Sequence, residues 1–215
     1  MRSRSNMSTK AVHEVFRLPE WTWEFHGHRC PMMPIGFRMG NLAMAELGTE
    51  KVKDHGAYAL SEMGIGHPQT CMMDGIQSAT GCTYGKLLIE RLNYGKLAMV
   101  LYKPSIGAVR VSVKPEFSDE LGKQEFFAYR KKGVEPSEIP SEVVERAISV
   151  VMQASDQDIF KVEKLAEFQF ESPLPRCLPR FGKAKCSKCG DYVFERYLRY
   201  VDGKPFCIPC SGYKQ

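Results

Sequence analysis

The chain has 215 residues, of which 43% are hydrophobic and 26% are charged, an ordinary composition for a folded globular protein. It contains no run of about 18 apolar residues, so we expect no membrane-spanning helix. The first residues are polar and basic, with no apolar stretch behind them. We therefore predict no export signal and expect a cytoplasmic protein.

The net charge of +5 is concentrated in the last part of the chain. Residues 174–215 carry nine Lys and Arg against three Asp and Glu, which leaves 21 basic and 22 acidic residues in the remainder. The change in charge coincides with Pro173, Pro175 and Pro179, a spacing typical of a linker. We therefore predict two domains, residues 1–173 and 174–215.

The first half of the chain favours helices around one strand. Ser8 caps an expected short helix over 8–18. A second helix is expected over 34–48, since Pro34 suits a helix start and Gly48 a helix end. A strand over 58–63 is followed by a predicted helix over 71–80, which Gly81 closes.

The second half of the core favours strands before and after a helix. Residues 97–102 and 108–113 predict an antiparallel hairpin. Residues 116–133 are highly charged and predict a short helix, and 141–154 predict a strongly amphipathic one. An edge strand is expected over 160–168. Because strands and helices do not alternate regularly, we predict an α+β fold with a mixed or antiparallel sheet and flanking helices.

Four of the eight cysteines form two C-x-x-C pairs separated by 17 residues. Without an export signal, this pattern indicates metal binding rather than disulfides. Four thiolates leave no coordination position for water, so the sequence predicts a structural zinc ion in a treble-clef or zinc-ribbon-like finger. The predicted ligands are Cys186, Cys189, Cys207 and Cys210.

The rest of this segment fits such a finger. Asp202-Gly203 predicts a hairpin turn between strands over 197–201 and 204–206, and the second cysteine pair should begin a short helix. The basic side chains around it suit an acidic protein or nucleic acid. Nucleic acid is the less favoured partner, because no long recognition helix follows the second pair. We assign no role to Cys177.

The chemistry of the core centres on residues 25–31, Phe-His-Gly-His-Arg-Cys-Pro. An extended chain places alternate side chains on one face, so His26, His28 and Cys30 are expected to point the same way. Pro31 favours that conformation for the cysteine. Cys30 also precedes the helix predicted over 34–48, whose dipole stabilises a thiolate.

Two further segments carry reactive groups. Cys71 and Asp74 share one face of their predicted helix. Cys82 lies in a turn with Thr83 and Lys86. Two mechanisms remain open, and so does an inert packing role for either distant thiol. His28, Cys30 and a distant thiol can hold a transition metal with an open position, or Cys30 is a thiolate, His28 its base and a distant cysteine the resolving thiol.

These motifs make the sequence similar to a known family. Phe-His-Gly-His-x-Cys-Pro followed by Gly36-x-Arg38, together with Asp-Gly-Ile-Gln-x-x-Thr-Gly-Cys-Thr-x-Gly-Lys over 74–86, resembles the FmdE-like family of formylmethanofuran dehydrogenase. Asp156 to Phe160 resembles a further family element. The resemblance implies an α+β core that forms an intertwined homodimer with a cleft. The site residues it implies are His26, His28, Cys30, Cys71, Asp74 and Cys82.

The sequence departs from the family pattern at Met32 and at Leu87-Leu88, which changes the mouth of the site. The run of four closely spaced cysteines that binds iron–sulfur clusters is missing, so we do not expect the redox subunit itself. We expect an accessory subunit of a dehydrogenase complex, a metal-handling protein or a thiol-based enzyme. The alternative is a zinc-finger adaptor or regulatory protein whose core dimerises or senses a ligand.

Overall fold

The computed structural model describes residues 16–171 and 182–213. The chain folds as two compact units, residues 1–170 and 171–215. The predicted domain boundary and Cys177 lie outside the described residues. So does most of the helix predicted over 8–18, and residues 16–18 belong to no helix or strand. Within the described ranges, no helix is long and apolar enough to span a bilayer.

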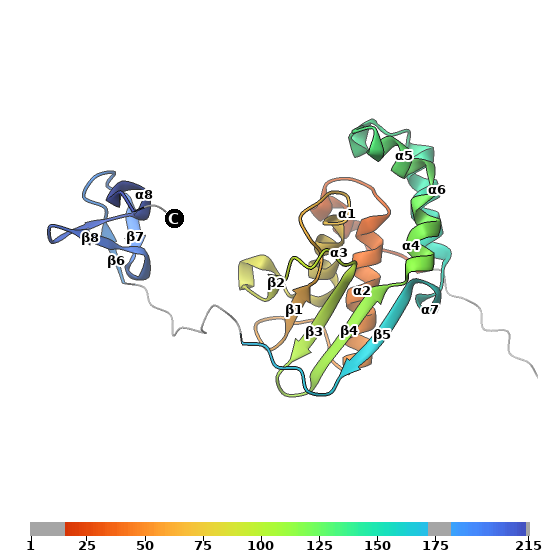
Figure 1. The fold of residues 1–215 in the computed structure, drawn as a ribbon, viewed down its shortest axis with the longest axis horizontal. Coiled ribbons are helices and arrows are strands. Elements are labelled where there is room, and N and C mark those ends of the chain that lie inside the picture. Colours follow the sequence, from red (N-terminus) through yellow and green to blue (C-terminus); the bar gives the residue numbers. More distant parts are fainter. Residues whose placement is uncertain (1–15, 172–181, 214–215) are drawn as a thin grey trace, which may run out of the picture. The chain divides into compact units, whose positions relative to one another are not determined.

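The core contains a five-stranded mixed sheet with the strand order β2-β1-β3-β4-β5 (Figure 1). β1 and β2 run parallel, and every other neighbouring pair is antiparallel. The predicted α+β class, the hairpin and the edge strand are confirmed. The strands are β1 (Tyr58–Ser61), β2 (Ile89–Arg91), β3 (Ala98–Lys103), β4 (Gly107–Val113) and β5 (Phe160–Leu165).

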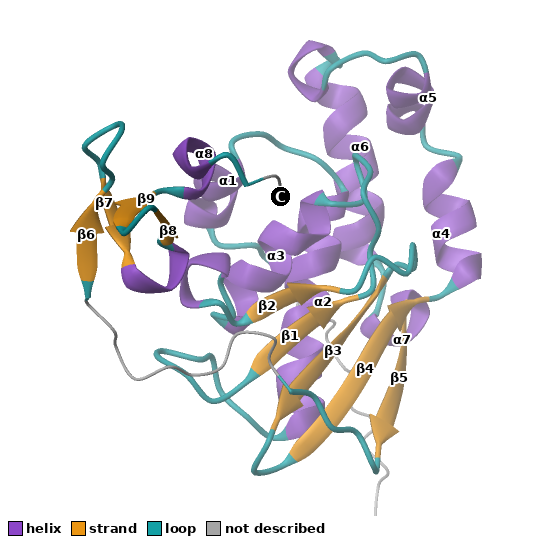
Figure 2. Cartoon of the chain, turned by 60° about the vertical axis from the view of Figure 1, so that its left-hand side comes forward, coloured by secondary structure: helices purple, strands orange, loops and turns teal. Residues whose placement is uncertain are grey.

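The helices form two groups. One group covers a face of the sheet, as Figure 2 shows for α2 and α3. It contains α2 (Met32–Leu47) and α3 (Cys71–Thr80), which lie on the sheet, with α1 (Glu20–His26) in contact with α3 and α7 (Asp156–Ile159) directly before β5. The second group, α4, α5 and α6, lies beyond the end of β4 (Figure 1). It consists of α4 (Pro115–Gly122), α5 (Glu125–Lys131) and α6 (Ser141–Gln153), with the short 3-10 turn η2 (Pro136–Glu138) between α5 and α6. A second 3-10 turn, η1 (Tyr84–Lys86), lies between α3 and β2. The segment 116–133 thus contains two helices where one was expected.

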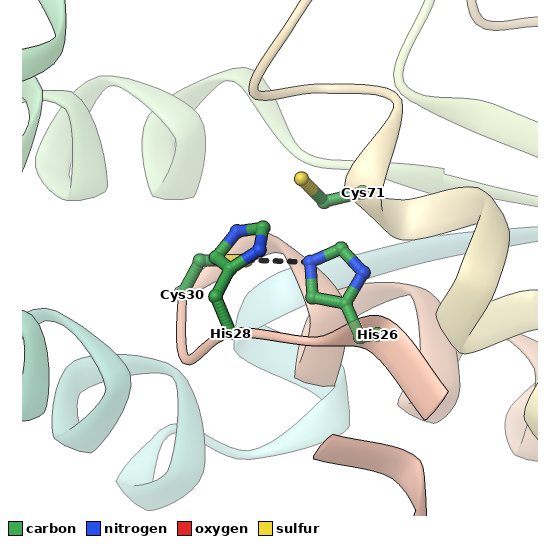
Figure 3. Close-up of side chains that lie close together, drawn as sticks. All are labelled: His26, His28, Cys30 and Cys71. Atoms are coloured by element: carbon green, nitrogen blue, oxygen red, sulfur yellow. Dashed lines mark hydrogen bonds between the residues drawn. The ribbon is translucent and has the colours of Figure 1, made fainter. Parts of the chain in front are cut away.

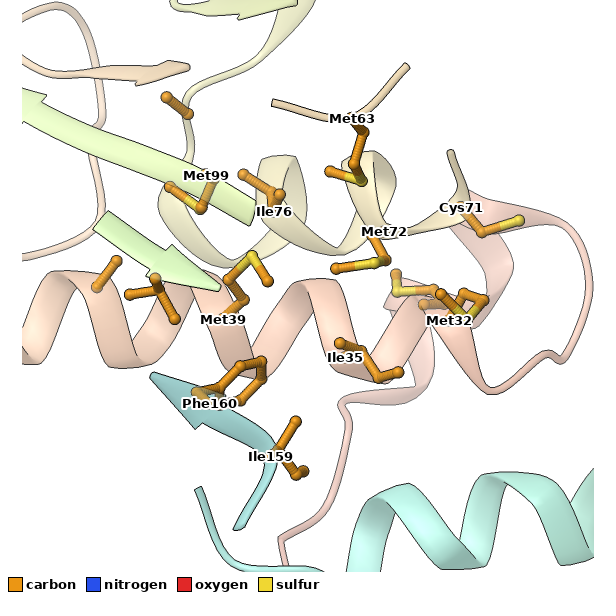
Figure 4. Packing of buried hydrophobic residues seen from close by; sticks show 14 of the residues in the cluster. Met32, Ile35, Met39, Met63, Cys71, Met72, Ile76, Met99, Ile159 and Phe160 are labelled. Atoms are coloured by element: carbon orange, nitrogen blue, oxygen red, sulfur yellow. The ribbon is translucent and has the colours of Figure 1, made fainter. Parts of the chain in front are cut away.

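The hydrophobic core lies between the sheet and the helices α2 and α3. Met39 of α2, Ile76 of α3 and Met99 of β3 are fully buried there (Figure 4). On the opposite face of the sheet, Phe168 and Phe170 pack on the rings of Tyr102 and Tyr58, with ring centroids 5.5 and 5.4 Å apart. β1 and β3 are therefore covered on both faces, which explains why all four residues of β1 are buried.

Helices α2 and α3 cross with their backbones in contact. A Cβ on Gly75 would lie 2.8 Å from the carbonyl carbon of Gly36, and a Cβ on Gly36 would lie 2.6 Å from the carbonyl carbon of Met72. No side chain fits between the helices at these two positions. The close crossing holds the beginnings of both helices near each other, and each beginning carries a cysteine.

The second unit has two hairpins and one short helix, of which the sequence predicts the second hairpin and the helix. Asp202 and Gly203 form the second hairpin turn with φ values of 49° and 72°. The second cysteine pair begins the helix, as expected. The elements are β6 (Lys183–Lys185), β7 (Tyr192–Phe194), η3 (Glu195–Tyr197), β8 (Arg199–Val201), β9 (Lys204–Phe206) and α8 (Ile208–Ser211).

Candidate metal centres

The segment 25–31 is not extended, so that expectation is wrong. His26 is the last residue of α1, and Gly27 adopts the left-handed conformation with φ 86° that ends the helix. Glycine suits this position because a side chain disfavours positive φ. The chain reverses at Gly27, and His28 and Cys30 return toward His26. The predicted convergence is present, but a helix end and a turn produce it.

Arg29 anchors this turn from the outside. Its guanidinium pairs with Glu145 of α6, with Nη2 to Oε2 at 2.9 Å, and lies over the ring of Trp23 at 4.6 Å from the centroid. These contacts tie Arg29 to α6 and to α1. They hold the turn that carries His28 and Cys30, whose ligand atoms converge with those of His26 and Cys71.

Four side chains bring their ligand atoms together at this place. The nitrogen or sulfur atoms of His26, His28, Cys30 and Cys71 all lie within 4.8 Å of one another (Figure 3). Cys30 lies just before α2 and Cys71 is the first residue of α3, so both sulfurs lie at helix N-termini. Their residues are 0% and 3% exposed. The structure therefore places His26, rather than Cys82, in the group with the other three.

A chain of hydrogen bonds orients His26. Its Nδ1 lies 2.8 Å from Asp74 Oδ2, and its Nε2 lies 3.5 Å from Cys30 Sγ. Gln77 donates to the other carboxylate oxygen of Asp74 at 3.3 Å. Burial lowers the pKa of His26, but the hydrogen bonds with Asp74 and Cys30 outweigh it and raise the pKa to about 9. In the metal-free site His26 is therefore an imidazolium at neutral pH.

The imidazole of His28 completes the inner surface of the site. Its ring centroid lies 4.2 Å from that of His26. Its Nε2 is buried and has no hydrogen-bond partner among the described residues. A buried ring nitrogen without a partner carries a desolvation cost that a metal ion removes. The residues present therefore fit a metal ion.

The two thiols of the site are electrostatically distinct. A hydrogen bond from Cys71 lowers the pKa of Cys30 well below its ordinary value despite burial, and His26 and His28 lower it further. The same interaction with Cys30, together with burial, raises the pKa of Cys71. Of the two sulfurs, Cys30 thus favours the thiolate form and Cys71 favours the thiol form.

Cys82 lies away from this group. Its Sγ donates to the carbonyl of Ala57 at 3.6 Å, and burial raises its pKa. Lys86 in the same turn donates to the carbonyls of Val52 and Lys53 at 3.0 and 3.1 Å. These contacts hold the loop before β1, so the third predicted segment supports the fold around the site.

His67 also reaches the site, although the sequence motifs did not predict it. Its Nε2 lies 3.1 Å from Cys71 Sγ, and its Nδ1 lies 2.8 Å from Arg130 Nη2. One signal was available in the sequence. His67 precedes Cys71 by four residues, as His26 precedes Cys30, and each cysteine lies at the start of a helix.

The four cysteines of the second unit form a separate cluster. Their sulfurs lie within 4.8 Å of one another, and Cys189 and Cys207 are 3.9 Å apart. The backbone N–H of Lys188 donates to Cys186 Sγ at 3.4 Å. Backbone N–H groups lower the pKa of Cys186 to about 6. The largest contribution comes from Cys189, followed by those from Cys207 and Lys188. N–H donors aimed at sulfur are typical of a turn that holds thiolates around zinc.

Known proteins match both units. Residues 25–161 match the family described as FmdE, molybdenum formylmethanofuran dehydrogenase operon. Residues 179–215 match the prokaryotic dksA/traR C4-type zinc finger. The resemblance predicted from the motifs is thereby confirmed, and so is the zinc-finger domain at the C-terminus.

Two individual proteins are also similar. A probable S-adenosyl-L-methionine-binding protein from Archaeoglobus fulgidus is 32% identical over 202 residues, which cover 88% of this chain and 51% of that protein. The chain thus spans about half the length of this curated relative. The crystal structure of a tungsten formylmethanofuran dehydrogenase FmdE-like protein from Syntrophus aciditrophicus matches with a TM-score of 0.53 and 22% identity, covering 90% of this chain and 89% of that one. That similarity shows a shared fold. The chain belongs to the FmdE family and carries a C4-type zinc finger behind the family domain.

Proposed function

We propose that the core is a metal-binding centre in which His26 Nε2, His28 Nε2, Cys30 Sγ and Cys71 Sγ hold one transition metal ion. The observation that carries the proposal is the convergence of these four side chains, whose ligand atoms lie within 4.8 Å of one another. Two nitrogens and two sulfurs in a compact group favour zinc among the common metals. We propose a second, structural zinc for the four cysteines of the finger.

The burial of both core thiols favours the metal over a thiol nucleophile. A catalytic thiolate needs contact with its substrate, and reactive cysteines are at least partly exposed. Cys30 is 0% exposed and Cys71 is 3% exposed. Cys82 was one of the two candidates for the resolving thiol, but its Sγ donates a hydrogen bond to the Ala57 carbonyl instead. The low pKa of Cys30 prepares a metal ligand equally well, because the thiolate is the ligand form.

Each residue of the site has a defined task in this proposal. Asp74 accepts from His26 Nδ1, which leaves the Nε2 side of the ring directed at the metal position. The turn anchored by Arg29 presents His28 and Cys30, and the α2–α3 crossing supplies Cys71. When bound, zinc supplies tetrahedral coordination and Lewis acidity. Four protein donors close that coordination, which favours holding or transferring the ion over activating a water molecule.

We propose that the protein acts as a metal-handling accessory protein of the FmdE type, associated with a formylmethanofuran dehydrogenase-like oxidoreductase. The family match over 25–161 supports this role. The sequence lacks the cysteine run that feeds electrons through iron–sulfur clusters, which favours an accessory role over that of a redox subunit. We also propose, from what the family implies, that the protein forms a homodimer and associates with a larger dehydrogenase complex.

Elemental analysis of the purified full-length protein tests the core site. We expect about two zinc ions per chain in the wild type and about one in Cys30→Ser, with the finger still loaded. The matched control is Cys82→Ser, which should retain both ions. If the wild type and Cys30→Ser both held only one zinc ion per chain, the proposal would be contradicted.

The surface of the finger supports a second function, docking to an acidic protein. Tyr192 is 62% exposed, with Lys183 and Lys185 at 4.5 and 5.5 Å from its ring centroid. Arg199 lies over Tyr213 at 5.9 Å, and this ring is 59% exposed. Aromatic residues and arginine are enriched in protein interfaces. We propose that this surface, Lys183, Lys185, Tyr192, Arg199 and Tyr213, contacts an acidic partner.

Binding of a poly-glutamate peptide and of a single-stranded oligonucleotide, each measured against salt concentration, tests this second function. We expect the full-length protein to bind the peptide more tightly, and Lys183→Ala with Lys185→Ala to weaken binding several-fold. Tighter binding of the oligonucleotide, with the same loss in the variant, would assign the surface to nucleic acid instead.

A further inference from the structure

His67 lies at the edge of the four core ligands, and neither the motifs nor the comparisons give it a role. Its Nε2 lies 3.1 Å from Cys71 Sγ, and its ring centroid lies 6.1 Å from that of His28. Its nitrogen is not among the atoms that converge within 4.8 Å. It contacts one ligand and stands outside the group.

His26 and His67 each contact the cysteine that follows four residues later in the sequence. The other ring nitrogen of His26 faces a carboxylate, whereas that of His67 faces a guanidinium. Asp74 accepts from His26 Nδ1, so Nε2 of His26 is the nitrogen that can bind a metal. Arg130 has only donors, and its Nη2 lies 2.8 Å from His67 Nδ1. His67 Nδ1 must therefore accept, and the neutral ring carries its proton on Nε2. That nitrogen donates toward Cys71 and offers no lone pair to a metal.

The arginine that fixes this tautomer is itself held in place. Its Nη1 donates to the carbonyl of Val134 and lies 3.4 Å from Glu135 Oε2. The side chain of Arg130 is only 13% exposed. Because the loop after α5 fixes the guanidinium, the orientation of the His67 ring is fixed as well.

We propose that His67 is a positioning residue for the core metal, whose Nε2–H, set by Arg130, donates to the Cys71 thiolate and stabilises it as a ligand. This inference rests on the proposed metal-binding function. A metal-bound Cys71 must be a thiolate, and His67 Nε2 is within hydrogen-bond distance of its Sγ, at 3.1 Å. Donors behind a metal ligand typically change metal affinity about 10–100-fold.

Cobalt titration of the full-length protein, with zinc already in the finger, tests the proposal. The thiolate-to-cobalt charge-transfer band reports on the sulfur ligands, and Cys30→Ser gives the baseline without a core site. We expect His67→Phe to weaken cobalt binding about ten-fold or more and to shift the band. His67→Gln keeps an N–H near the same place and should recover most of both. The control His55→Phe alters an exposed histidine in the loop before β1 and should change neither.

Three results would overturn the inference. One is a His67→Phe protein with wild-type affinity and band. Another is equal loss in His67→Phe and His67→Gln, which would make His67 a direct ligand. The third comes from nitrogen-15 NMR of the metal-free protein. The inference fails if His67 of the wild type lacks the Nε2–H tautomer, or if the Arg130→Met variant shows the same tautomer as the wild type. Failure of the proposed function itself looks different, because the wild type would then bind no more cobalt than Cys30→Ser.

Discussion

Gly75 of α3 packs directly on the backbone of Gly36 of α2, so that a Cβ on Gly75 would lie 2.8 Å from the Gly36 carbonyl carbon. This contact sets the spacing between the two helices. Cys30 and Cys71 stand at the beginnings of these helices, so the same contact sets the distance between the two thiols. The site therefore depends on two residues that have no side chain.

Replacing Gly75 by Ala should damage both the fold and the site. The added methyl meets backbone atoms of α2, which cannot move aside as a side chain can. Overpacking of this kind costs about 1–3 kcal/mol and occasionally more. We expect the core to unfold at a lower urea concentration and to bind its metal more weakly. Gly85→Ala is the matched control, because a Cβ at Gly85 meets open space. Equal stability of the two variants would contradict the account.

The pKa of His26 predicts the pH dependence of metal binding. The metal-free site holds a proton on His26 up to pH of about 9 and another on Cys71, whose pKa is raised. A metal ion displaces about two protons, so the affinity should rise by about two decades per pH unit between pH of about 7 and 9.

Asp74→Asn removes the carboxylate that helps to raise the pKa of His26 above its ordinary value of 6.5. Proton release should then fall toward about one per metal ion in the same pH range. Calorimetry in buffers with different ionisation enthalpies measures the number of protons released. Unchanged release in Asp74→Asn would show that the carboxylate does not control the protonation of His26.

Cys82→Ala should leave the metal content of the core unchanged. Cys82 Sγ donates to the Ala57 carbonyl at 3.6 Å and lies outside the group of converging ligand atoms. Losing this weak bond and the sulfur volume should cost about 1 kcal/mol of stability. Elemental analysis together with urea unfolding checks both expectations. Loss of the core metal at unchanged stability would place Cys82 in the site after all.

Arg38 should prove structural, although it belongs to a family motif. Its guanidinium donates to Asp156 at 2.9 and 2.6 Å and to the carbonyl of Val151, which ties α2 to the end of α6. Lysine cannot reproduce these bonds. We expect Arg38→Lys to cost about 2–3 kcal/mol in urea unfolding while the metal count stays at about two. Arg146→Lys, in an exposed pair with Glu125, should cost less than about 0.5 kcal/mol.

Residues typical of helix starts and helix ends were enough to predict most of the elements that form the site. Gly48 and Gly81 end α2 and α3 in the left-handed conformation, as predicted. The prediction failed where period-two alternation was applied to only a few residues. Gly27 breaks that segment, because a helix ends there, and glycine at such a position is a helix-end signal that outweighed the alternation.

Which residues belong to the core site depends on tertiary contacts, and local sequence patterns do not predict such contacts. Cys71 and Cys82 looked equivalent in the sequence, but only Cys71 begins a helix that crosses α2. Arg130 reaches His67 across 63 residues, a pairing that spacing alone cannot predict. In contrast, the ligand set of the finger was predictable, since its four cysteines come in two local pairs.

Anomalous diffraction at the zinc absorption edge, on crystals of the full-length protein grown with zinc, tests the central claim most directly. We expect two peaks per chain, one among the four cysteines of the finger and one between His26 Nε2, His28 Nε2, Cys30 Sγ and Cys71 Sγ. A single peak in the finger, with these four core side chains ordered and no density between them, would contradict it.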